Sequence, residues 1–343
     1  MNNLVLFDDS QRNDILVKRK GETKFGEHVQ LLSNFNHIYD QMLNMDVDYV
    51  LFGISEDIGV FANHGKTGTS SAWDTAIKVL LNVQSNSFTN PNKMLILGHL
   101  YPKKALKKLA SLDAKSKKDI SKARKMVEKI DEEISHLVYR IVKAGKIPII
   151  VGGGHNNSYG NLKGTSLALN KAINVINFDA HTEFRPEEGR HSGNGFSYAF
   201  AEGFLKKYFV FGLHENYTSK NILAAMNKLE KKIKYNTFEA IKIRKELDFN
   251  DEMQNALEHI IDRPFGIEVD CDAIENIHSS AMTPSGFSGN EAREFVSFFA
   301  KQENANYLHI CEAAPSQGTK EQAAQTGKLI SYLITDFMQA HGN

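Results

Sequence analysis

The chain has 343 residues, of which 41% are hydrophobic, and this size suits one large domain or two smaller ones with a substantial core. Its 41 basic and 41 acidic side chains balance, so we expect neither nucleic acid nor an anionic membrane as a partner. No apolar run approaches the roughly 20 residues that span a bilayer, and the N-terminus lacks a signal-peptide pattern. Cys271 and Cys311 are too few for a disulfide-built secreted domain. We therefore expect a cytoplasmic protein with reduced thiols.

The first half of the chain predicts a strand and two helices. The run VDYVLFGI at 47–54 is apolar enough for a buried strand, and a glycine-rich segment then leads to a predicted helix around Ala76 and Leu80. Residues 115–144 carry many charges with apolar side chains at helical spacing, and Gly145 ends this pattern. We interpret the basic stretch KSKKDISKARK as the solvated face of this helix.

The second half predicts strands that alternate with helical stretches. The strands are expected at about 147–152, 173–178, 207–213, 264–270 and 306–311. Runs such as IPIIV are apolar on both faces, as a parallel sheet covered by helices requires. A capping box at Ser288 and Glu291 begins a further helix, and EQAAQTGKLISYLITDFMQA predicts a helix at the end. The chain is therefore predicted to be a single α/β domain over 1–343.

Acidic and histidine side chains follow several of the predicted strands. In INFDAHTEF, Asp179, His181 and Glu183 alternate, so in an extended chain their side chains share one face. Other strand-like runs end in the same chemistry, namely at His155, Asp270, Asp272 and Glu312. In open α/β sheets, sites form outside the carboxyl ends of the strands. We therefore predict that these residues share a metal site.

Taken together, GGGH, DAHTE, EVDCDAIEN and the late strand-end glutamate resemble the patterns GGDH, DAHxD, SxDxDxxDP and Glu of the ureohydrolase family, which includes arginases, agmatinases and formimidoylglutamases. The resemblance covers about 48–343. It implies a three-layer α/β/α sandwich with a mostly parallel central sheet and a pair of Mn²⁺ ions bridged by hydroxide. It further implies one ion held by His155, Asp179, Glu183 and Asp270, and the other by Asp179, His181, Asp270 and Asp272.

The donor chemistry agrees with this implication. Oxygen-rich sites with a few imidazoles suit Mn²⁺, whereas a thiolate-poor site gives no reason to favour structural zinc. The carboxylates of Asp179, Glu183, Asp270 and Asp272 would balance the charge of two divalent ions. Two such ions, about 3.5 to 4 Å apart, lower the pKa of a shared water and hold the hydroxide for attack.

The sequence departs from the family patterns at several positions. Gly154 replaces an acid beside His155, and loss of such a partner can weaken metal affinity by about 10- to 100-fold. Glu183 is one methylene longer than the family's aspartate, and Glu268 stands where the family has serine. These changes leave open a metal-poor, non-catalytic relative that acts as a binding subunit. Phe196 occupies the position of an arginase histidine, which disfavours arginase chemistry.

The loop after the DAHTE motif suggests the substrate. Arg185 and Arg190 could each bind a carboxylate, which fits N-formimidoyl-L-glutamate and not agmatine, although both could instead be loop arginines paired with neighbouring glutamates. Ser192 and Asn194 complete the predicted substrate contacts.

The leading hypothesis is a manganese formimidoylglutamase of histidine degradation that releases glutamate and formamide. Glu183 would relay a proton and Glu312 would hold the cationic amidine group. A urea-releasing relative of arginase or agmatinase is the alternative, and a histone-deacetylase-like hydrolase ranks below both. The resemblance also implies a small-molecule amidine or guanidine substrate and a homo-oligomer.

Overall fold

A nine-stranded sheet organises the computed structural model, which describes residues 3–34 and 36–341. The strand order is β1-β3-β2-β4-β9-β8-β5-β6-β7, and every neighbouring pair is parallel except β1 with β3. The strands are β1 (Leu4–Leu6), β2 (Tyr49–Ile54), β3 (Met94–Leu100), β4 (Ile147–Val151), β5 (Ile173–Phe178), β6 (Leu205–Leu213), β7 (Ile233–Thr237), β8 (Phe265–Asp270) and β9 (Ala305–Cys311).

Three interior strands are buried along their whole length, which explains their apolar sequences. Every residue of β2, β5 and β8 is buried, because helices cover both faces of the sheet. All the strands predicted from the sequence are present. The predicted strands that follow residue 145 begin and end within two residues of the expected bounds. The prediction of a mostly parallel α/β fold is confirmed.

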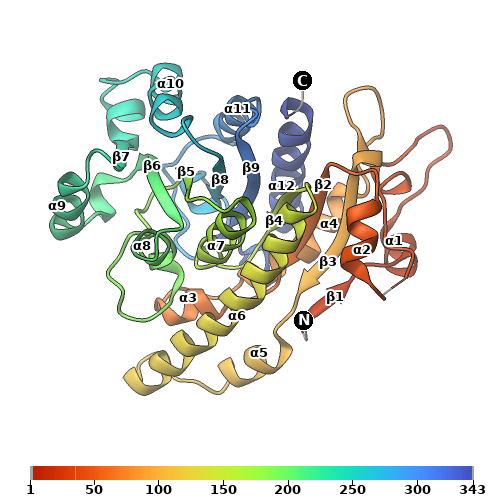
Figure 1. Cartoon of the computed structure of the whole chain (residues 1–343), viewed down its shortest axis with the longest axis horizontal. Helices are drawn as coiled ribbons and strands as arrows, with labels where there is room; N and C mark the ends of the chain where they lie inside the picture. The colour runs from red at the N-terminus through yellow and green to blue at the C-terminus, as the bar shows by residue number, and fades with distance from the viewer. Residues whose placement is uncertain (1–2, 35, 342–343) are drawn as a thin grey trace.

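Helices form a layer on each side of the sheet (Figure 1). The helices are α1 (Asp9–Ile15), α2 (Ile38–Asn44), α3 (Ile58–Ala62), α4 (Ala72–Leu80), α5 (Lys103–Leu109), α6 (Lys117–Lys143), α7 (Asn157–Leu169), α8 (Gly195–Ala201), α9 (Lys220–Lys228), α10 (Phe249–Ile260), α11 (Gly289–Ala300) and α12 (Lys320–Ala340). One apolar core contains side chains of α4, α10, α11 and α12, and the other contains those of α2, α3 and α5 to α9. The sheet therefore lies between two cores.

Two helices confirm the predicted start and stop signals. Helix α6 begins after Ser116, whose side chain accepts a hydrogen bond from the Asp119 backbone, and the chain leaves the helix at Gly145 with φ of +73°. Helix α11 begins with the capping box of Ser288 and Glu291. No helix within 3–34 and 36–341 is long and apolar enough to cross a membrane.

The order of the central strands brings distant parts of the chain together. Strands β4, β9, β8 and β5 are consecutive neighbours, although β5 follows β4 in the sequence. The connection from β4 to β5 therefore passes over two strands, and α7 forms its helix. Since these four strands are parallel, the residues that follow them gather at one edge of the sheet.

Candidate metal centre

His155 reaches the edge of the sheet through a glycine turn. Gly152 and Gly153 follow β4 with φ of +93° and +69°, a conformation that residues with a side chain rarely adopt. The turn leads directly into α7, which packs closely on α6 because a side chain at Gly160 would collide with Ile134. His155 is consequently held between a buried strand and a tightly packed helix, with its side chain fully buried.

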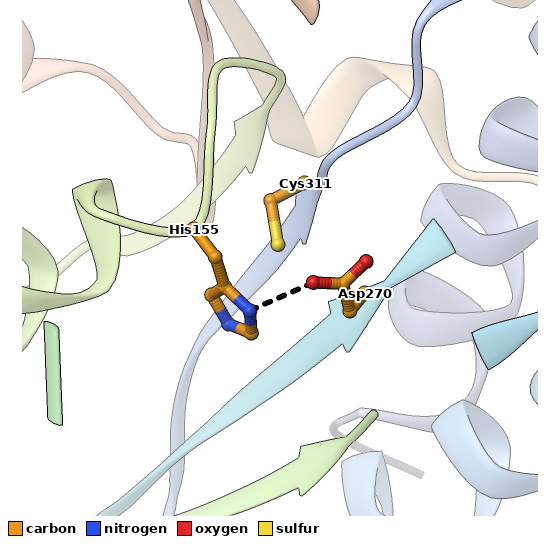
Figure 2. Close-up of side chains that lie close together, drawn as sticks. All are labelled: His155, Asp270 and Cys311. Carbon is orange, nitrogen blue, oxygen red and sulfur yellow. Dashed lines mark hydrogen bonds and ion pairs between the residues drawn. The ribbon is translucent and has the colours of Figure 1, made fainter. Parts of the chain in front are cut away.

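Two aspartates surround one nitrogen of His155. Its Nδ1 lies 2.9 Å from Asp270 Oδ2 and 3.2 Å from Asp179 Oδ2. Figure 2 shows this nitrogen facing Asp270 at the end of β8, with the Cys311 thiol beside the ring. Ligand atoms of His155, Asp179 and Glu183 lie within 4.8 Å of one another. This half of the cluster matches the first predicted ligand set.

Asp179 also faces a second histidine. His181 Nδ1 lies 3.6 Å from Asp179 Oδ1 and 3.3 Å from Asp272 Oδ1. The backbone fixes the carboxylates of Asp179 and Asp270. Asp179 Oδ1 accepts a hydrogen bond from the His181 N–H, and Asp270 Oδ1 accepts one from the Asp272 N–H. The structure thus brings all six predicted ligands into overlapping groups that share Asp179 and His155.

The cluster concentrates negative charge inside the protein. Burial, with the nearby Asp272 carboxylate, raises the pKa of Asp270 well above its usual value. Burial and the charge of Asp179 raise the pKa of Glu183 to about 8. Burial opposes ionisation of Asp179 too, but hydrogen bonds from His155 and His181 outweigh it and lower its pKa. Buried carboxylates are stable in such numbers only beside cations.

The donor set fits a pair of Mn²⁺ ions. Carboxylate oxygens predominate, the two imidazoles present Nδ1 to them, and Asp272 Oδ1 is buried without a hydrogen-bond partner among the described residues. His155 and Glu183 would hold one ion, and His181 and Asp272 the other. Asp179 and Asp270 would contribute to both.

Glu312 lies against the same cluster. It follows β9 with φ of +59°, its Oε1 accepts a hydrogen bond from the His155 N–H at 2.8 Å, and its Oε2 accepts one from Ser280 Oγ at 2.7 Å. Burial and the charge of Asp272 raise the pKa of Glu312 to about 7. The predicted substrate-holding carboxylate is therefore fixed next to His155.

The geometry explains why glycine occupies position 154. A Cβ there would lie 2.7 Å from Asn156 Oδ1, 2.8 Å from Val60 Cγ2 and 3.2 Å from Glu312 Oε1, which leaves no room for an acidic side chain. A buried carboxylate, Glu56, instead accepts hydrogen bonds from the Gly154 N–H and from Asn156. Sequence reasoning missed Glu56, although its place just after β2 was an available signal.

The two loop arginines have different environments. Arg185 is partly exposed and donates to Asn63 Oδ1 at 2.6 Å, and Asn63 in turn donates to Ser192 Oγ at 3.1 Å. Arg185, Asn63 and Ser192 thus form one polar group that extends from the exposed Arg185 to the buried Ser192. Sequence reasoning also missed Asn63.

The interpretation of Arg190 and Asn194 as substrate contacts needs correction. Arg190 is only 2% exposed, and its Nε donates to Asp131 Oδ2 at 2.8 Å while its Nη2 donates to the Asn156 carbonyl at 2.8 Å. Asn194 is fully buried, accepts from Arg190 and donates to the Gly189 carbonyl. Both side chains are occupied in holding the loop together.

A buried histidine in the same loop should make the protein sensitive to acid. Burial, followed by the charges of Arg185 and Arg124, lowers the pKa of His191 to about 3, so its contact with Glu188 is not an ion pair at neutral pH. Between about pH 6.5 and this value, the unfolded chain binds a proton that the folded protein does not. Stability therefore falls as the pH falls through this window.

The His191→Asn variant should lose less stability on acidification than the original protein. Between pH 7 and 5 we expect the difference to reach up to about 2 kcal/mol, as measured by urea unfolding of metal-free protein. Asparagine keeps an acceptor for the Gly193 N–H. His37→Asn, at an exposed position, is the matched control. Equal acid sensitivity of the His191 variant and the original protein would contradict the assignment.

Comparison with known proteins agrees with this fold. The profile of the arginase family matches residues 48–338, and the chain belongs to this family. Among its relatives, formimidoylglutamase of Streptococcus gordonii is 28% identical over 178 residues, which cover 50% of this chain and 48% of that protein. The enzyme of Streptococcus pyogenes serotype M3 is 28% identical over 176 residues, and these cover 49% and 47%. The match thus spans about half the length of these relatives.

Solved structures show the same architecture. Formimidoylglutamase from Bacillus subtilis has a TM-score of 0.74 with 18% identity, and the match covers 96% of both chains. Formiminoglutamase from Trypanosoma cruzi with Mn²⁺ has a TM-score of 0.71 with 18% identity, covering 93% of this chain and 99% of that chain. At this identity, the likeness establishes the arginase-like fold.

Proposed function

We propose that the protein is a manganese-dependent hydrolase that cleaves the C–N bond of N-formimidoyl-L-glutamate with water, giving L-glutamate and formamide. The observation that carries the proposal is the meeting of His155, Asp179, His181, Glu183, Asp270 and Asp272 at the carboxyl ends of β4, β5 and β8. The resemblance to streptococcal formimidoylglutamases supports this substrate over a guanidine. We further propose that the protein is a cytoplasmic homo-oligomer that acts in histidine degradation.

Residues in and beside the cluster have different roles in hydrolysis. When bound, two Mn²⁺ ions would supply a hydroxide nucleophile at neutral pH. Glu183 is partly buried beside Asp179 and can accept the proton of the attacking group and pass it to the leaving amine. Glu312 stays fixed through His155 and Ser280 and can hold the cationic formimidoyl group as the carbon becomes tetrahedral.

The polar group on the loop is suited to the glutamate part of the substrate. Arg185 is the exposed guanidinium there, and its present partners, Asn63 and Glu188, are also partly exposed. A substrate carboxylate can replace Glu188 on Arg185 without uncovering a buried charge. Arg190 is buried and paired with Asp131, so it cannot exchange its partner for a substrate in this way.

A substrate panel tests the proposal. Protein loaded with Mn²⁺ should release formamide from N-formimidoyl-L-glutamate faster than it releases urea from arginine, agmatine or guanidinobutyrate. Preferential release of urea would overturn the substrate and leave the metal centre standing. Fewer than about one bound ion per chain, together with no hydrolysis of any of these compounds, would favour a non-catalytic relative.

The Arg185→Ala variant should bind the dicarboxylate poorly. Loss of one charge-assisted contact is expected to raise KM for N-formimidoyl-L-glutamate by about 10- to 100-fold, with kcat changed much less. Slow hydrolysis of agmatine, which has no carboxylate, should keep its KM. Arg244→Ala is the matched control, because Arg244 is similarly exposed and pairs with Glu215 and Glu246. An unchanged KM in the Arg185 variant would exclude the anchoring role.

A further inference from the structure

A buried acid with two aromatic partners lies behind His155. Glu268 of β8 is the register partner of His309 on β9, and both side chains are fully buried. Glu268 Oε2 lies 2.5 Å from His309 Nδ1, and Oε1 accepts a hydrogen bond from the Tyr307 hydroxyl at 2.8 Å. Both carboxylate oxygens are therefore held in place from the neighbouring strand.

This carboxylate faces the side of His155 that the metal cluster does not use. Nδ1 of His155 faces Asp179 and Asp270, and Figure 2 shows the other ring nitrogen turned away from Asp270. That nitrogen, Nε2, lies 3.5 Å from Glu268 Oε2 and is buried without a hydrogen-bond partner among the described residues. The nearby Cys311 thiol donates to the Val269 carbonyl at 3.7 Å and therefore keeps its proton. The negative charge that faces Nε2 is that of the Glu268 carboxylate.

We propose that Glu268 is a positioning residue that receives the Nε2–H of His155 and thereby directs the Nδ1 lone pair at the metal position. A metal-binding histidine is commonly oriented by a carboxylate on its second nitrogen, which fixes the tautomer and makes the ligand more basic. The turn before His155 has no space for an acid at Gly154. In this chain the acid that faces Nε2 of His155 lies on β8.

The Glu268→Gln variant separates metal affinity from fold stability. We expect Mn²⁺ binding at the His155 position to weaken by about 10- to 100-fold while the His181 position changes little, so equilibrium dialysis should resolve two classes of site. Tyr307→Phe is the matched control, because it also removes a buried hydrogen bond from this group but keeps the charge of Glu268. Its Mn²⁺ affinity should stay within about threefold of the original, although both variants lose similar thermal stability.

A double-variant cycle tests whether Glu268 acts through His155. In a His155→Asn background, Glu268→Gln should cause no further loss of Mn²⁺ affinity, because the group that Glu268 orients has been removed. An equal loss in both backgrounds would overturn the proposal. So would unchanged Mn²⁺ affinity in the single variant, since a purely structural role would then explain any fall in Tm.

A measurement on the unaltered protein covers the case in which Glu268→Gln does not fold. In protein with ¹⁵N-labelled histidine, loaded with diamagnetic Zn²⁺, the Nε2–H of His155 should exchange slowly with water and resonate downfield, as expected for a hydrogen bond to the Glu268 carboxylate. An Nε2–H signal without this downfield shift would overturn the proposal. The inference rests on the proposed metal centre, but different results would refute the metal centre and the role of Glu268. If the original protein binds no Mn²⁺ the centre itself is wrong, whereas normal binding that is insensitive to Glu268 refutes only the role of Glu268.

Discussion

Replacing Asp270 by asparagine should reduce amidine hydrolysis by more than about 1,000-fold, since without bound metal the pKa of water returns from about 7 towards 15.7 and little hydroxide forms at neutral pH. Asp270 Oδ2 faces His155 Nδ1, and Oδ1 is fixed by the Asp272 N–H. Asparagine keeps the size and the second contact of this side chain. It removes the charge that both metal positions would share.

The same substitution should stabilise the metal-free protein. Burial and the charge of Asp272 raise the pKa of Asp270, which means that its ionised form destabilises the folded state at neutral pH. Relief of this repulsion should increase Tm without metal, as expected where function requires a strained cluster of charges. Added Mn²⁺ at 100 times its Kd should stabilise the original protein by about 2.7 kcal/mol and the variant by much less.

Asp74→Asn is the control for the loss of one carboxylate, because Asp74 is exposed on α4. Calorimetry with and without Mn²⁺, and formamide release by the same samples, give both readouts. An Asp270 variant that binds Mn²⁺ normally, or keeps more than a tenth of its activity, would contradict the proposed centre.

Replacing Arg190 by methionine should destabilise the protein by about 3 to 5 kcal/mol, because it leaves Asp131 as an unpaired buried charge. The guanidinium lies 2.8 Å from Asp131 Oδ2 and packs 4.9 Å from the ring centre of Tyr159 and 5.0 Å from that of Tyr198. Burial raises the pKa of Asp131 to about 6 despite Arg190. Asp131 is therefore ionised at pH 8, and urea unfolding at this pH measures the effect of losing the ionised Arg190–Asp131 pair.

Two further variants show where this loss comes from. Adding Asp131→Leu to Arg190→Met should recover at least part of the stability, because no unpaired charge is then buried. Arg293→Met removes a comparable pair with Asp336 at a more exposed position and should cost about 1 kcal/mol or less. The folded Arg190→Met variant should keep the KM of the original protein for N-formimidoyl-L-glutamate. A large increase in KM with little loss of stability would restore Arg190 as a substrate anchor.

Strand ends were predictable from the sequence where apolar runs stop at chemically distinctive residues. IPIIV, INVINF and FGIEVD are buried on both faces, and the residues after them meet because the strands are parallel neighbours. The edges of the sheet were harder to predict. Strand β1 has three residues, and β7 has the polar sequence IKYNT, in which only Ile233 and Asn236 are buried. Strand β1 is too short, and β7 too polar, to show the long apolar run of an interior strand.

Side-chain partners were less predictable because they depend on contacts between distant segments. Arg185 and Arg190 lie in one charged loop, yet only the fold places Asp131 of α6 beside Arg190. The same holds for Glu268, which the motif comparison marked only as a departure. Its role became visible through His309 and Tyr307 on the adjacent strand.

The most direct test is to titrate metal-free protein with Mn²⁺ and follow formamide release from N-formimidoyl-L-glutamate against the number of ions bound per chain. The proposed function predicts that activity rises until two ions are bound and that chelation abolishes it. Full activity without bound metal, or no hydrolysis of this or any other amidine at two ions per chain, would contradict it.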